Sequence, residues 1–220
     1  MAKRLFDIGI AAVALLLLTL PLSLVAVAIL LVDGKPVFYP QRRIGRGGRS
    51  FWLYKFRTMR SAEDGPVITT QGDHRITPTG AVLRRWKIDE LPQFWNVLRG
   101  DMSIVGPRPE ADRLVHYYTP EQRRLLEQTP GLASMSQLVY PHEADLLQGY
   151  SNPEEMYVKQ LMPKKIAVDL EYEHTRTFHS DLRLLAELAL LVIASRSQRI
   201  DRDFCIISPQ KKDLELTTKS

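Results

Sequence analysis

The longest apolar run of the chain covers residues 8–32 and contains no charged side chain. Its 25 residues are enough for a helix to cross a hydrocarbon core about 30 Å thick. Because the run is apolar on every side, it predicts a helix in lipid and not one that lays a single face on a soluble core. A cleaved signal peptide is the competing interpretation, but the apolar region of such a peptide is only about 7–15 residues long.

The charges beside this run and a proline within it bear on its placement. Lys3 and Arg4 precede it, and residues 33–60 add eight Lys or Arg and one Asp. Cationic flanks favour the cytoplasmic side, and a straight span can satisfy only one of the two. Pro21 removes an amide donor and bends the helix. A re-entrant helix-break-helix in residues 1–32 explains the charges and the proline together, whereas a single-span anchor kinked at the proline stays open.

The rest of the chain predicts a mainly helical α+β fold. Residues 37–39 and 51–54 are β-prone and flank the sequence IGRGG, which predicts a small β-hairpin. Between Asp89 and Gly100, acids precede a proline in the first turn and a glycine ends the pattern, so Asp89 stands at the entrance of a predicted helix. Helical spacing gives this helix an expected apolar face made of Leu91, Phe94, Trp95 and Leu98.

Further helices are expected at residues 81–86, 119–128, 156–172 and 181–195. Pro163 interrupts the third of these. The fourth is too short to span a membrane, so we expect it on the body or at the membrane interface. The sequence thus predicts a membrane helix at 1–32, a cytosolic membrane-associated domain at 33–195 and a frayed C-terminal tail at 196–220.

The net charge of +5 is a local feature. Residues 33–60 carry +7 and residues 61–220 sum to −3, which argues against a nucleic-acid-binding body with a broad basic face. The basic cluster at residues 33–60 suits anionic lipid headgroups or the phosphates of a substrate, and both stay open. The single cysteine, Cys205, excludes an internal disulfide and a four-cysteine zinc site, which fits a body facing the cytosol.

The adjacent carboxylates Asp89 and Glu90 are candidate catalytic residues, because neighbouring side chains on a helix diverge by about 100° and can address two groups. The helix dipole favours the aspartate as the anion, which suits a nucleophile or a Mg²⁺ ligand. A partly dry setting instead raises the pKa of a glutamate toward that of a general base. A helix N-cap followed by a first-turn acid is the alternative that spacing leaves open. Arg108 lies between Pro107 and Pro109, whose restricted backbones make it a positioned cation.

Five motifs follow the apolar segment in order along the chain. They are QRRIGRGGRSF at 41–51, KFRTMR at 55–60, LR at 83–84, DELPQ at 89–93 and GDMSIVGPRP at 100–109. Together with Pro21 in the apolar segment, they resemble the bacterial sugar transferase family in its small form, the monotopic phosphoglycosyl transferases. Several motifs in this order are far more specific than any one of them alone.

The resemblance implies an enzyme that moves a phosphosugar from a UDP-sugar to a polyprenyl phosphate such as undecaprenyl phosphate. Such a step initiates polysaccharide or glycoconjugate assembly at the cytoplasmic face of the cell inner membrane. It implies that Asp89 attacks the sugar-bearing phosphorus, releasing UMP and forming an aspartyl-phosphosugar intermediate, while Glu90 assists the attack of the lipid phosphate. Mg²⁺ would bind at Asp89 beside the diphosphate. By the same resemblance, the substrate-binding residues are Arg84, Arg108, Lys55 and Arg57. The alternative that each of them pairs with a carboxylate or with lipid headgroups stays open.

Two interpretations from other classes stay open. A membrane-bound, Mg-dependent hydrolase of nucleotide-sugar diphosphates would pass the phosphosugar to water. A non-catalytic scaffold would bind anionic membrane lipids through the basic cluster. The sequence indicates no nucleic-acid partner, and it is compatible with a homo-oligomer without specifying one.

Residues 131–150 depart from the commonest family pattern. Many members carry Pro-Gly-Ile-Thr-Gly with a downstream Gln and Arg, whereas this chain reads PGLASMSQ from Pro130 and YPHEAD from Tyr140. The departure leaves the donor sugar open and does not involve the two adjacent carboxylates.

Overall fold

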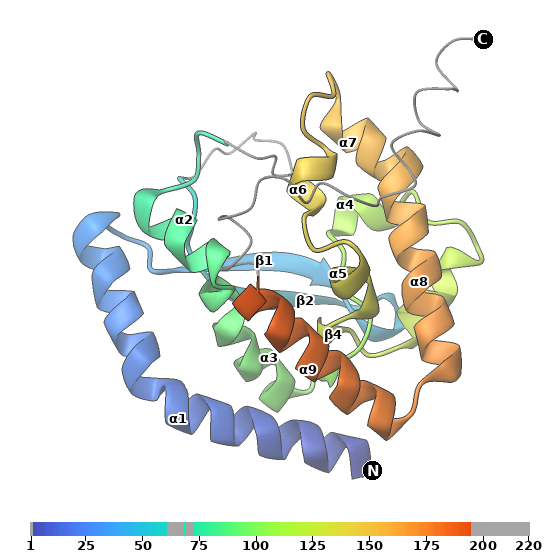
Figure 1. Ribbon diagram of the computed structural model, residues 1–220, viewed down its shortest axis with the longest axis horizontal. Coiled ribbons are helices and arrows are strands. Elements are labelled where there is room, and N and C mark those ends of the chain that lie inside the picture. The colour runs from blue at the N-terminus through green and yellow to red at the C-terminus, as the bar shows by residue number, and fades with distance from the viewer. Residues whose placement is uncertain (1, 61–67, 69–72, 195–220) are drawn as a thin grey trace.

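The structure, a computed structural model, describes residues 2–60, 68 and 73–194 (Figure 1). Within these residues the chain is mainly helical and contains two small two-stranded sheets. The predicted α+β class with a small hairpin is therefore confirmed. The predicted tail at 196–220 and Cys205 lie outside the described residues.

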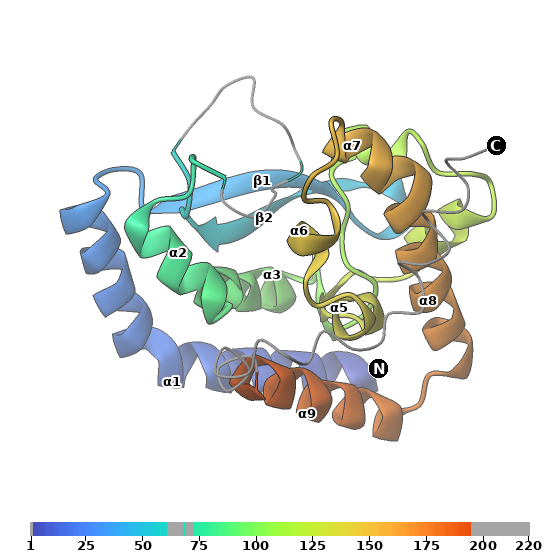
Figure 2. The ribbon, with the colours of Figure 1, turned by 45° about the horizontal axis from the view of Figure 1, so that its top comes forward.

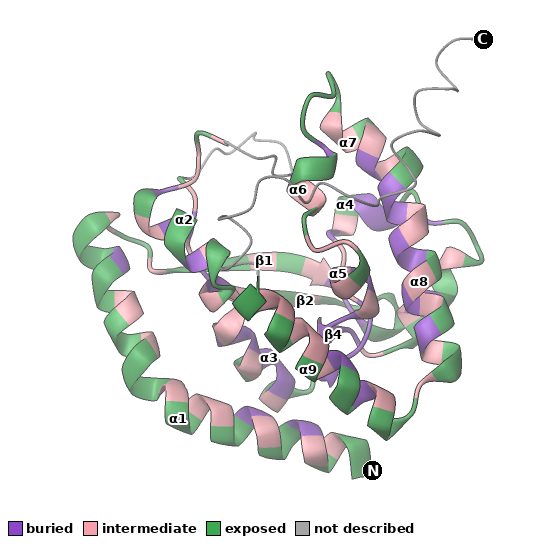
Figure 3. Ribbon diagram, viewed as in Figure 1, coloured by how far each residue is buried: buried purple, intermediate pink, exposed green. Residues whose placement is uncertain are grey.

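The apolar N-terminal run forms one helix, α1 (Ala2–Val32). By length and composition, α1 is long and apolar enough to cross a membrane. Most of its residues are not buried, as the colours of Figure 3 show, and the buried ones are Asp7, Ala11 and Ile29. Water would solvate the remaining apolar side chains poorly, so α1 associates with a membrane.

The helix bends without the predicted break. The helix is continuous through Pro21, and Figure 1 shows α1 changing direction along its length. The Thr19 hydroxyl donates to the Leu15 carbonyl at 2.7 Å, and the Ser23 hydroxyl donates to the Thr19 carbonyl at 2.8 Å. Hydroxyls that bond back to the preceding turn satisfy acceptors in an apolar setting and accompany helix bending.

The predicted hairpin is confirmed and is longer than its apolar runs suggested. Strand β1 (Phe38–Ile44) pairs antiparallel with β2 (Ser50–Phe56), and Gln41 lies opposite Leu53. The turn between them contains the short 3₁₀ helix η1 (Arg46–Gly48). Gly47 adopts a φ of 69° there, in the left-handed region that glycine enters without strain.

The segment that carries the two candidate carboxylates begins after α2 (Pro78–Arg85). Lys87 has a left-handed φ of 56°, and the 3₁₀ helix η2 (Ile88–Gln93) then leads into α3 (Phe94–Arg99). Asp89 lies in the first turn of η2, so its predicted place at a helix entrance is confirmed. The single predicted helix is split in two. Pro92 has no amide hydrogen to donate, which favours a change of helix type nearby.

The predicted apolar face of this helix is partly wrong. Trp95 is 52% exposed, whereas Asn96 is fully buried. The Asn96 amide donates to the Trp52 carbonyl at 2.7 Å and accepts from the Tyr54 amide at 3.0 Å. A polar side chain therefore faces the body because it satisfies main-chain groups of β2, which the 3.6-residue pattern does not reveal.

A second sheet, which the sequence pattern did not predict, holds the loop that carries Arg108. Strand β3 (Ser103–Val105) pairs in parallel with β4 (Gly131–Ala133). A Cβ atom at Gly131 would lie 2.1 Å from the amide nitrogen of Gly106. Only glycine allows the two backbones to approach so closely at this point.

The C-terminal half is mainly helical, but its helices begin and end at other residues than predicted. The helix predicted at 119–128 is a 3₁₀ helix, η3 (Gln122–Glu127), which follows the short helix α4 (Asp112–Val115). Two unpredicted short helices come next, α5 (Met135–Val139) and α6 (Glu143–Leu146). The region predicted at 156–172 consists of α7 (Pro153–Met156), a π-helical turn η4 (Tyr157–Leu161) and α8 (Met162–Thr175). Pro163 lies in the first turn of α8, where its missing donor costs little.

The last helix, α9 (Phe178–Ala194), confirms the prediction at 181–195 within one turn. Figure 2 shows α1 and α9 along one side of the molecule, the hairpin on the opposite side, and α3 and α5 between them. The rings of Phe6 and Phe178 meet edge to face at 5.0 Å and join the two helices. Leu190 and Ile193 of α9 are exposed, so this helix adds apolar surface to the same side as α1.

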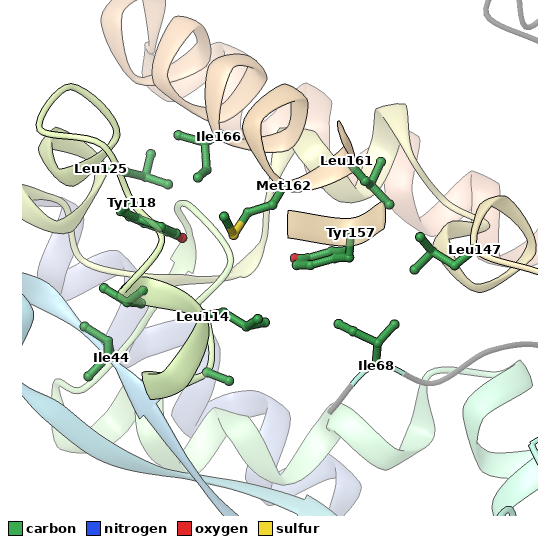
Figure 4. Packing of buried hydrophobic residues seen from close by; sticks show 12 residues of the cluster. Ile44, Ile68, Leu114, Tyr118, Leu125, Leu147, Tyr157, Leu161, Met162 and Ile166 are labelled. Atoms are coloured by element: carbon green, nitrogen blue, oxygen red, sulfur yellow. The ribbon is translucent and has the colours of Figure 1, made fainter. Parts of the chain in front are cut away.

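The hydrophobic core consists of three clusters. The largest packs α4 and η3 against η4 and α8, around Leu114, Tyr157 and Met162 (Figure 4). A second cluster joins α1, α3 and α9 to the parallel sheet. The third joins Ile29 of α1 to Phe56 of β2 and Leu83 of α2. The hairpin, α2 and η2 are therefore fixed to one another where the candidate carboxylates lie.

Candidate active site

The two candidate carboxylates leave η2 in different directions. A 3₁₀ helix has three residues per turn, so adjacent side chains diverge by about 120°. Asp89 is buried and Glu90 is half-buried. The diverging directions let the two acids contact different groups, as their adjacent positions in the sequence predicted.

Five cationic side chains from other parts of the chain surround this pair. Electrostatic interactions join the carboxylates to Lys55 of β2, Arg84 of α2, Lys87 before η2 and Arg108 after β3, and join Glu90 to Arg43 of β1. The structure therefore brings together five of the six residues predicted for the site, namely Asp89, Glu90, Arg84, Arg108 and Lys55. The excess of positive charge suits a ligand with several phosphate oxygens.

Glu90 forms a two-pronged ion pair with Arg108. The distances are 2.5 Å from Nη2 to Oε1 and 3.3 Å from Nη1 to Oε2. Burial alone would raise the pKa of Glu90, but Arg108, Lys87 and Lys55 outweigh it and lower the pKa to about 2. Glu90 is thus an anion throughout the neutral range. The fork of Arg108, predicted to hold a donor phosphate, is held by Glu90 in this structure.

Asp89 has the opposite shift. Burial, followed by the negative charge of Glu90, raises the pKa of Asp89 despite the nearby cations Lys87, Arg84 and Lys55. The expected assignment, with an acidic aspartate and a glutamate of raised pKa, is therefore wrong in both directions. The reason is that Arg108 reaches Glu90 and not Asp89.

One oxygen of Asp89 has no hydrogen-bond partner among the described residues. Oδ1 is buried, and a buried oxygen without a donor loses its hydration without compensation unless a ligand supplies a contact. The described part of the chain contains no group of three or more His, Cys, Asp or Glu side chains that could hold a metal. Mg²⁺ commonly uses one or two carboxylates together with substrate phosphates and water, so Asp89 fits its requirements.

Lys55 contributes a cation whose pKa is lower than that of an ordinary lysine. Burial, followed by the positive charge of Arg43, lowers the pKa of Lys55 to about 8. Its Nζ donates to Gln41 Oε1 at 3.2 Å and lies 5.4 Å from the centre of the Tyr39 ring. The site therefore loses this positive charge as the pH rises above about 8.

Gln41 and Arg43 belong to the site but were not singled out from the sequence. Gln41 Oε1 accepts from Arg43 Nη2 at 2.8 Å as well as from Lys55, so one amide oxygen orients two cations. Arg43 also donates to the Pro109 carbonyl at 3.2 Å. The period of two along β1 places both side chains on one face of the hairpin, and that signal could have identified them.

Arg57 is the predicted site residue that the structure places elsewhere. Its guanidinium donates to the main-chain carbonyls of Lys35 at 2.5 Å, of Asp33 at 2.7 Å and of Gly34 at 2.7 Å. These carbonyls follow the C-terminal end of α1, where a cation complements the helix dipole. Arg57 therefore attaches the end of α1 to the hairpin.

The segment that departs from the family pattern, residues 131–150, shares a hydrogen-bond acceptor with the loop that carries Arg108. Asp169 of α8 accepts from the amide and the hydroxyl of Ser136, both at 2.8 Å, and from the backbone amide of Arg108. Burial raises the pKa of Asp169 to about 6 although these donors oppose the shift. Residues 131–150 thus help to hold the backbone of the loop that carries Arg108.

Together these groups can carry out phosphoryl transfer. A buried carboxylate with an open oxygen can attack phosphorus or hold a metal, and the surrounding cations can neutralise phosphate oxygens. A second carboxylate is held as an anion beside it. No other group of residues in the described part of the chain combines these features.

Comparison with known proteins gives a family and several relatives. A family model described as "Bacterial sugar transferase" matches residues 1–195. A UDP-glucose:undecaprenyl-phosphate glucose-1-phosphate transferase of Caulobacter vibrioides is 39% identical over 188 residues, which cover 83% of this chain and 66% of that protein. An uncharacterized sugar transferase, EpsL, of Bacillus subtilis is 36% identical over 194 residues, which cover 88% of each chain.

A third relative is the UDP-N-acetylgalactosamine-undecaprenyl-phosphate N-acetylgalactosaminephosphotransferase of Aeromonas hydrophila. It is 41% identical over 150 residues, which cover 65% of this chain and 35% of that protein. The chain thus spans between about a third and two thirds of the length of the two relatives whose names state a donor.

Proposed function

Because the chain belongs to the bacterial sugar transferase family, we propose that it transfers a sugar 1-phosphate from a UDP-sugar to undecaprenyl phosphate and so initiates polysaccharide or glycoconjugate assembly. The observation that carries the proposal is the Asp89–Glu90 pair within its ring of cations. The names of the relatives from C. vibrioides and A. hydrophila support the choice of donor and acceptor classes. These names differ in their sugar, so the donor sugar of this chain is left open.

In the first half-reaction, a carboxylate oxygen of Asp89 attacks the sugar-bearing phosphorus. The new bond joins that oxygen to phosphorus, and the bond to the bridging oxygen breaks, so that UMP leaves with the electron pair. Arg84 and Lys55 lie close enough to interact with Asp89 and offset the charge of the entering diphosphate. Mg²⁺ held by Asp89 would neutralise further charge on the diphosphate.

In the second half-reaction, an oxygen of the lipid phosphate attacks the same phosphorus. The Asp89–phosphorus bond breaks, the carboxylate is restored, and the product is a polyprenyl diphosphosugar. Glu90 is available as an anion to accept a hydrogen bond from a protonated lipid phosphate and so orient it, whereas its pKa of about 2 makes it a weak base. Arg108 keeps Glu90 in that form and in one orientation.

The purified full chain in detergent, supplied with Mg²⁺, UDP-sugars and undecaprenyl phosphate, tests this proposal. We expect UMP and a lipid-linked diphosphosugar to form in equal amounts. Release of UMP with free sugar 1-phosphate in the absence of lipid would instead indicate a hydrolase. Absence of both products with every UDP-sugar tried, in a chain that still binds anionic vesicles, would support the scaffold interpretation.

We also propose that α1 is re-entrant, with both ends and the body at the cytoplasmic face of the inner membrane. At its start, Arg4 donates to the Val97 and Leu98 carbonyls at 2.6 and 2.9 Å. At its end, Arg57 binds the carbonyls that follow α1. Since α3 and β2 belong to one packed body, a straight span could not keep both attachments. The cationic flanks favour the cytoplasmic side.

Cysteine labelling in membrane vesicles of known orientation checks this topology. In a chain with Cys205 replaced by serine, single cysteines at Leu5 and at Val37 should both react with an impermeant maleimide added from the cytoplasmic side. The matched control is a cysteine at Leu17, within the exposed apolar part of α1, which lipid should protect. Labelling of Leu5→Cys and Val37→Cys from opposite sides would contradict re-entry and restore the single-span anchor.

A further inference from the structure

A cavity of about 390 Å³ lies where the end of α1 meets the hairpin and the start of α2. Its lining includes Asp33, Lys35, Arg57, Arg60 and Thr77. The volume falls within the range of small-molecule sites in proteins. The cavity is separate from the Asp89–Glu90 pair, and the proposed reaction gives it no role.

The charge of this cavity is positive. Lys35, Arg57 and Arg60 contribute three cations, and Asp33 is the one carboxylate among the lining residues that the structure describes. Within the described residues, the side chains of Lys35 and Arg60 are exposed and form no ion pair. The Asp33 carboxylate accepts from the Thr77 hydroxyl at 2.9 Å. Two cations are therefore available to an anion.

Two further groups add to the attraction for an anion. Arg57 directs both Nη atoms to main-chain carbonyls, and its Nε is buried without a hydrogen-bond partner in the described structure. Helix α2 begins at Pro78, which lines the cavity, and the start of a helix carries partial positive charge. The cavity thus combines two exposed cations, Lys35 and Arg60, with the positive charge of Arg57 and of the start of α2.

The cavity also adjoins the lipid-facing part of α1. Val32 lines it, and Leu31 and Val32 are 79% and 65% exposed apolar residues on the last turn of α1. With α1 in a membrane, this turn and the cationic Lys35 lie where hydrocarbon gives way to headgroups. An anion that enters the cavity can therefore carry an apolar chain that continues along α1.

We propose that this cavity binds the phosphate of an anionic bilayer phospholipid, with its acyl chains against the C-terminal part of α1. The inference rests on the membrane placement proposed for α1, but not on the transfer reaction. Lys35 and Arg60 contact the phosphate, and Arg57 fixes the wall that receives it. The bound lipid holds the end of α1 against the hairpin and α2.

The geometry favours a lipid that does not react. Arg57 follows Lys55 by two residues, about 7 Å along an extended chain. Pro78 and Arg84 lie at opposite ends of α2, about 9 Å apart along its axis. A phosphate held by Arg57 and the start of α2 is therefore displaced from Lys55 and Arg84, which interact with Asp89, whereas the phosphate of the acceptor lipid must contact the intermediate formed at Asp89.

Native mass spectrometry of the full chain, released from nanodiscs of phosphatidylglycerol and phosphatidylcholine, tests the proposal. We expect the wild-type chain to retain one phosphatidylglycerol. The K35Q/R60Q variant should retain it at an occupancy at least about tenfold lower, the range expected for loss of charge-assisted contacts. The matched control is R49Q/R123Q, which removes the same charge from two exposed arginines outside the cavity and should retain the lipid.

Competition identifies the source of the phosphate. Millimolar inorganic phosphate should leave phosphatidylglycerol bound, and its displacement would overturn the proposal in favour of a soluble anion. Displacement by an equimolar amount of undecaprenyl phosphate would overturn it in favour of an acceptor subsite. Equal loss of lipid in K35Q/R60Q and R49Q/R123Q would reduce the effect to general charge attraction, which also overturns a specific site.

The readout does not depend on transferase activity. If the chain retains phosphatidylglycerol as expected but forms no UMP with any UDP-sugar, the proposed function fails and the lipid site stands. If UMP and lipid product form while K35Q/R60Q retains the lipid at wild-type occupancy, the lipid site fails and the proposed function stands.

Discussion

Replacing Asp89 by asparagine is expected to abolish turnover and to prevent formation of a trapped phosphosugar adduct. Asparagine keeps the shape of the side chain but removes the nucleophilic carboxylate, and loss of a covalent nucleophile costs several orders of magnitude in rate. Radiolabelled or mass-resolved UDP-sugar, incubated without acceptor lipid, should label the wild-type chain and leave the variant unlabelled. An adduct that persists in Asp89→Asn would exclude Asp89 as the nucleophile.

The same variant should fold at least as stably as the wild type. Burial raises the pKa of Asp89, which means that the folded state disfavours its charged form. An acid with a raised folded-state pKa lowers stability at pH values above its unfolded-state pKa, and asparagine removes this cost. Thermal unfolding at neutral pH should therefore show an unchanged or higher Tm, which separates a catalytic loss from a folding defect.

Asp112→Asn is the matched control for this comparison. Asp112 is a carboxylate in α4 whose nearest cation, Arg42, is 3.9 Å away, and both side chains are about half exposed. Exposed pairs of this kind contribute little to stability. The control should therefore form the adduct and turn over at close to the wild-type rate.

The local elements were predictable because their signals lie within a few neighbouring residues. The glycine-containing turn and its β-prone flanks predicted the hairpin, and the acids before Pro92 predicted that Asp89 stands at a helix entrance. The parallel pairing of β3 with β4 was not predictable in this way. It joins residues 103 and 131, and its close contact at Gly106 and Gly131 becomes visible only when the two segments meet.

The site shows the same division between local and distant causes. The motifs identified Asp89 and Glu90, but their order of acidity depends on which of them Arg108 reaches from 18 residues away. Arg57 follows Lys55 by two residues, yet the end of α1 occupies its guanidinium, so the two cations serve different places. The sequence motifs identify the charged residues of the site. Only the tertiary contacts show which of these residues pair with each other.

Because Arg108 pairs with Glu90, substitutions of Arg108 should have other effects than they would if Arg108 bound only a phosphate. Arg108→Gln leaves Glu90 partly buried without its strongest partner. Arg108 is 32% exposed and Glu90 is 15% exposed, so we expect a stability loss of about 2–3 kcal/mol, below the 3–5 kcal/mol of fully buried pairs. Arg108→Lys keeps the charge but loses the fork, and should cost about 1–3 kcal/mol of transition-state stabilisation.

The pH dependence of this loss has a defined sign. Arg108, Lys87 and Lys55 lower the pKa of Glu90 from 4.5 to about 2. An acid with a lowered folded-state pKa adds stability that is complete above its unfolded-state value and disappears as the pH falls through the folded-state value. Much of this contribution, lost between about pH 4.5 and 2 in the wild type, should already be absent from Arg108→Gln at neutral pH.

Separating the two half-reactions shows whether Arg108 acts through Glu90. If it does, Arg108→Gln and Glu90→Gln should each slow transfer to lipid more than they slow adduct formation, and the double variant should be no slower than the slower single variant. Arg108→Gln should also move the acid limb of the lipid-transfer profile to higher pH, because the pKa of Glu90 rises when its cation is removed. Residues that act as a unit give such non-additive effects. Additive losses in the double variant, with adduct formation slowed as much as lipid transfer, would instead place Arg108 on the donor phosphate.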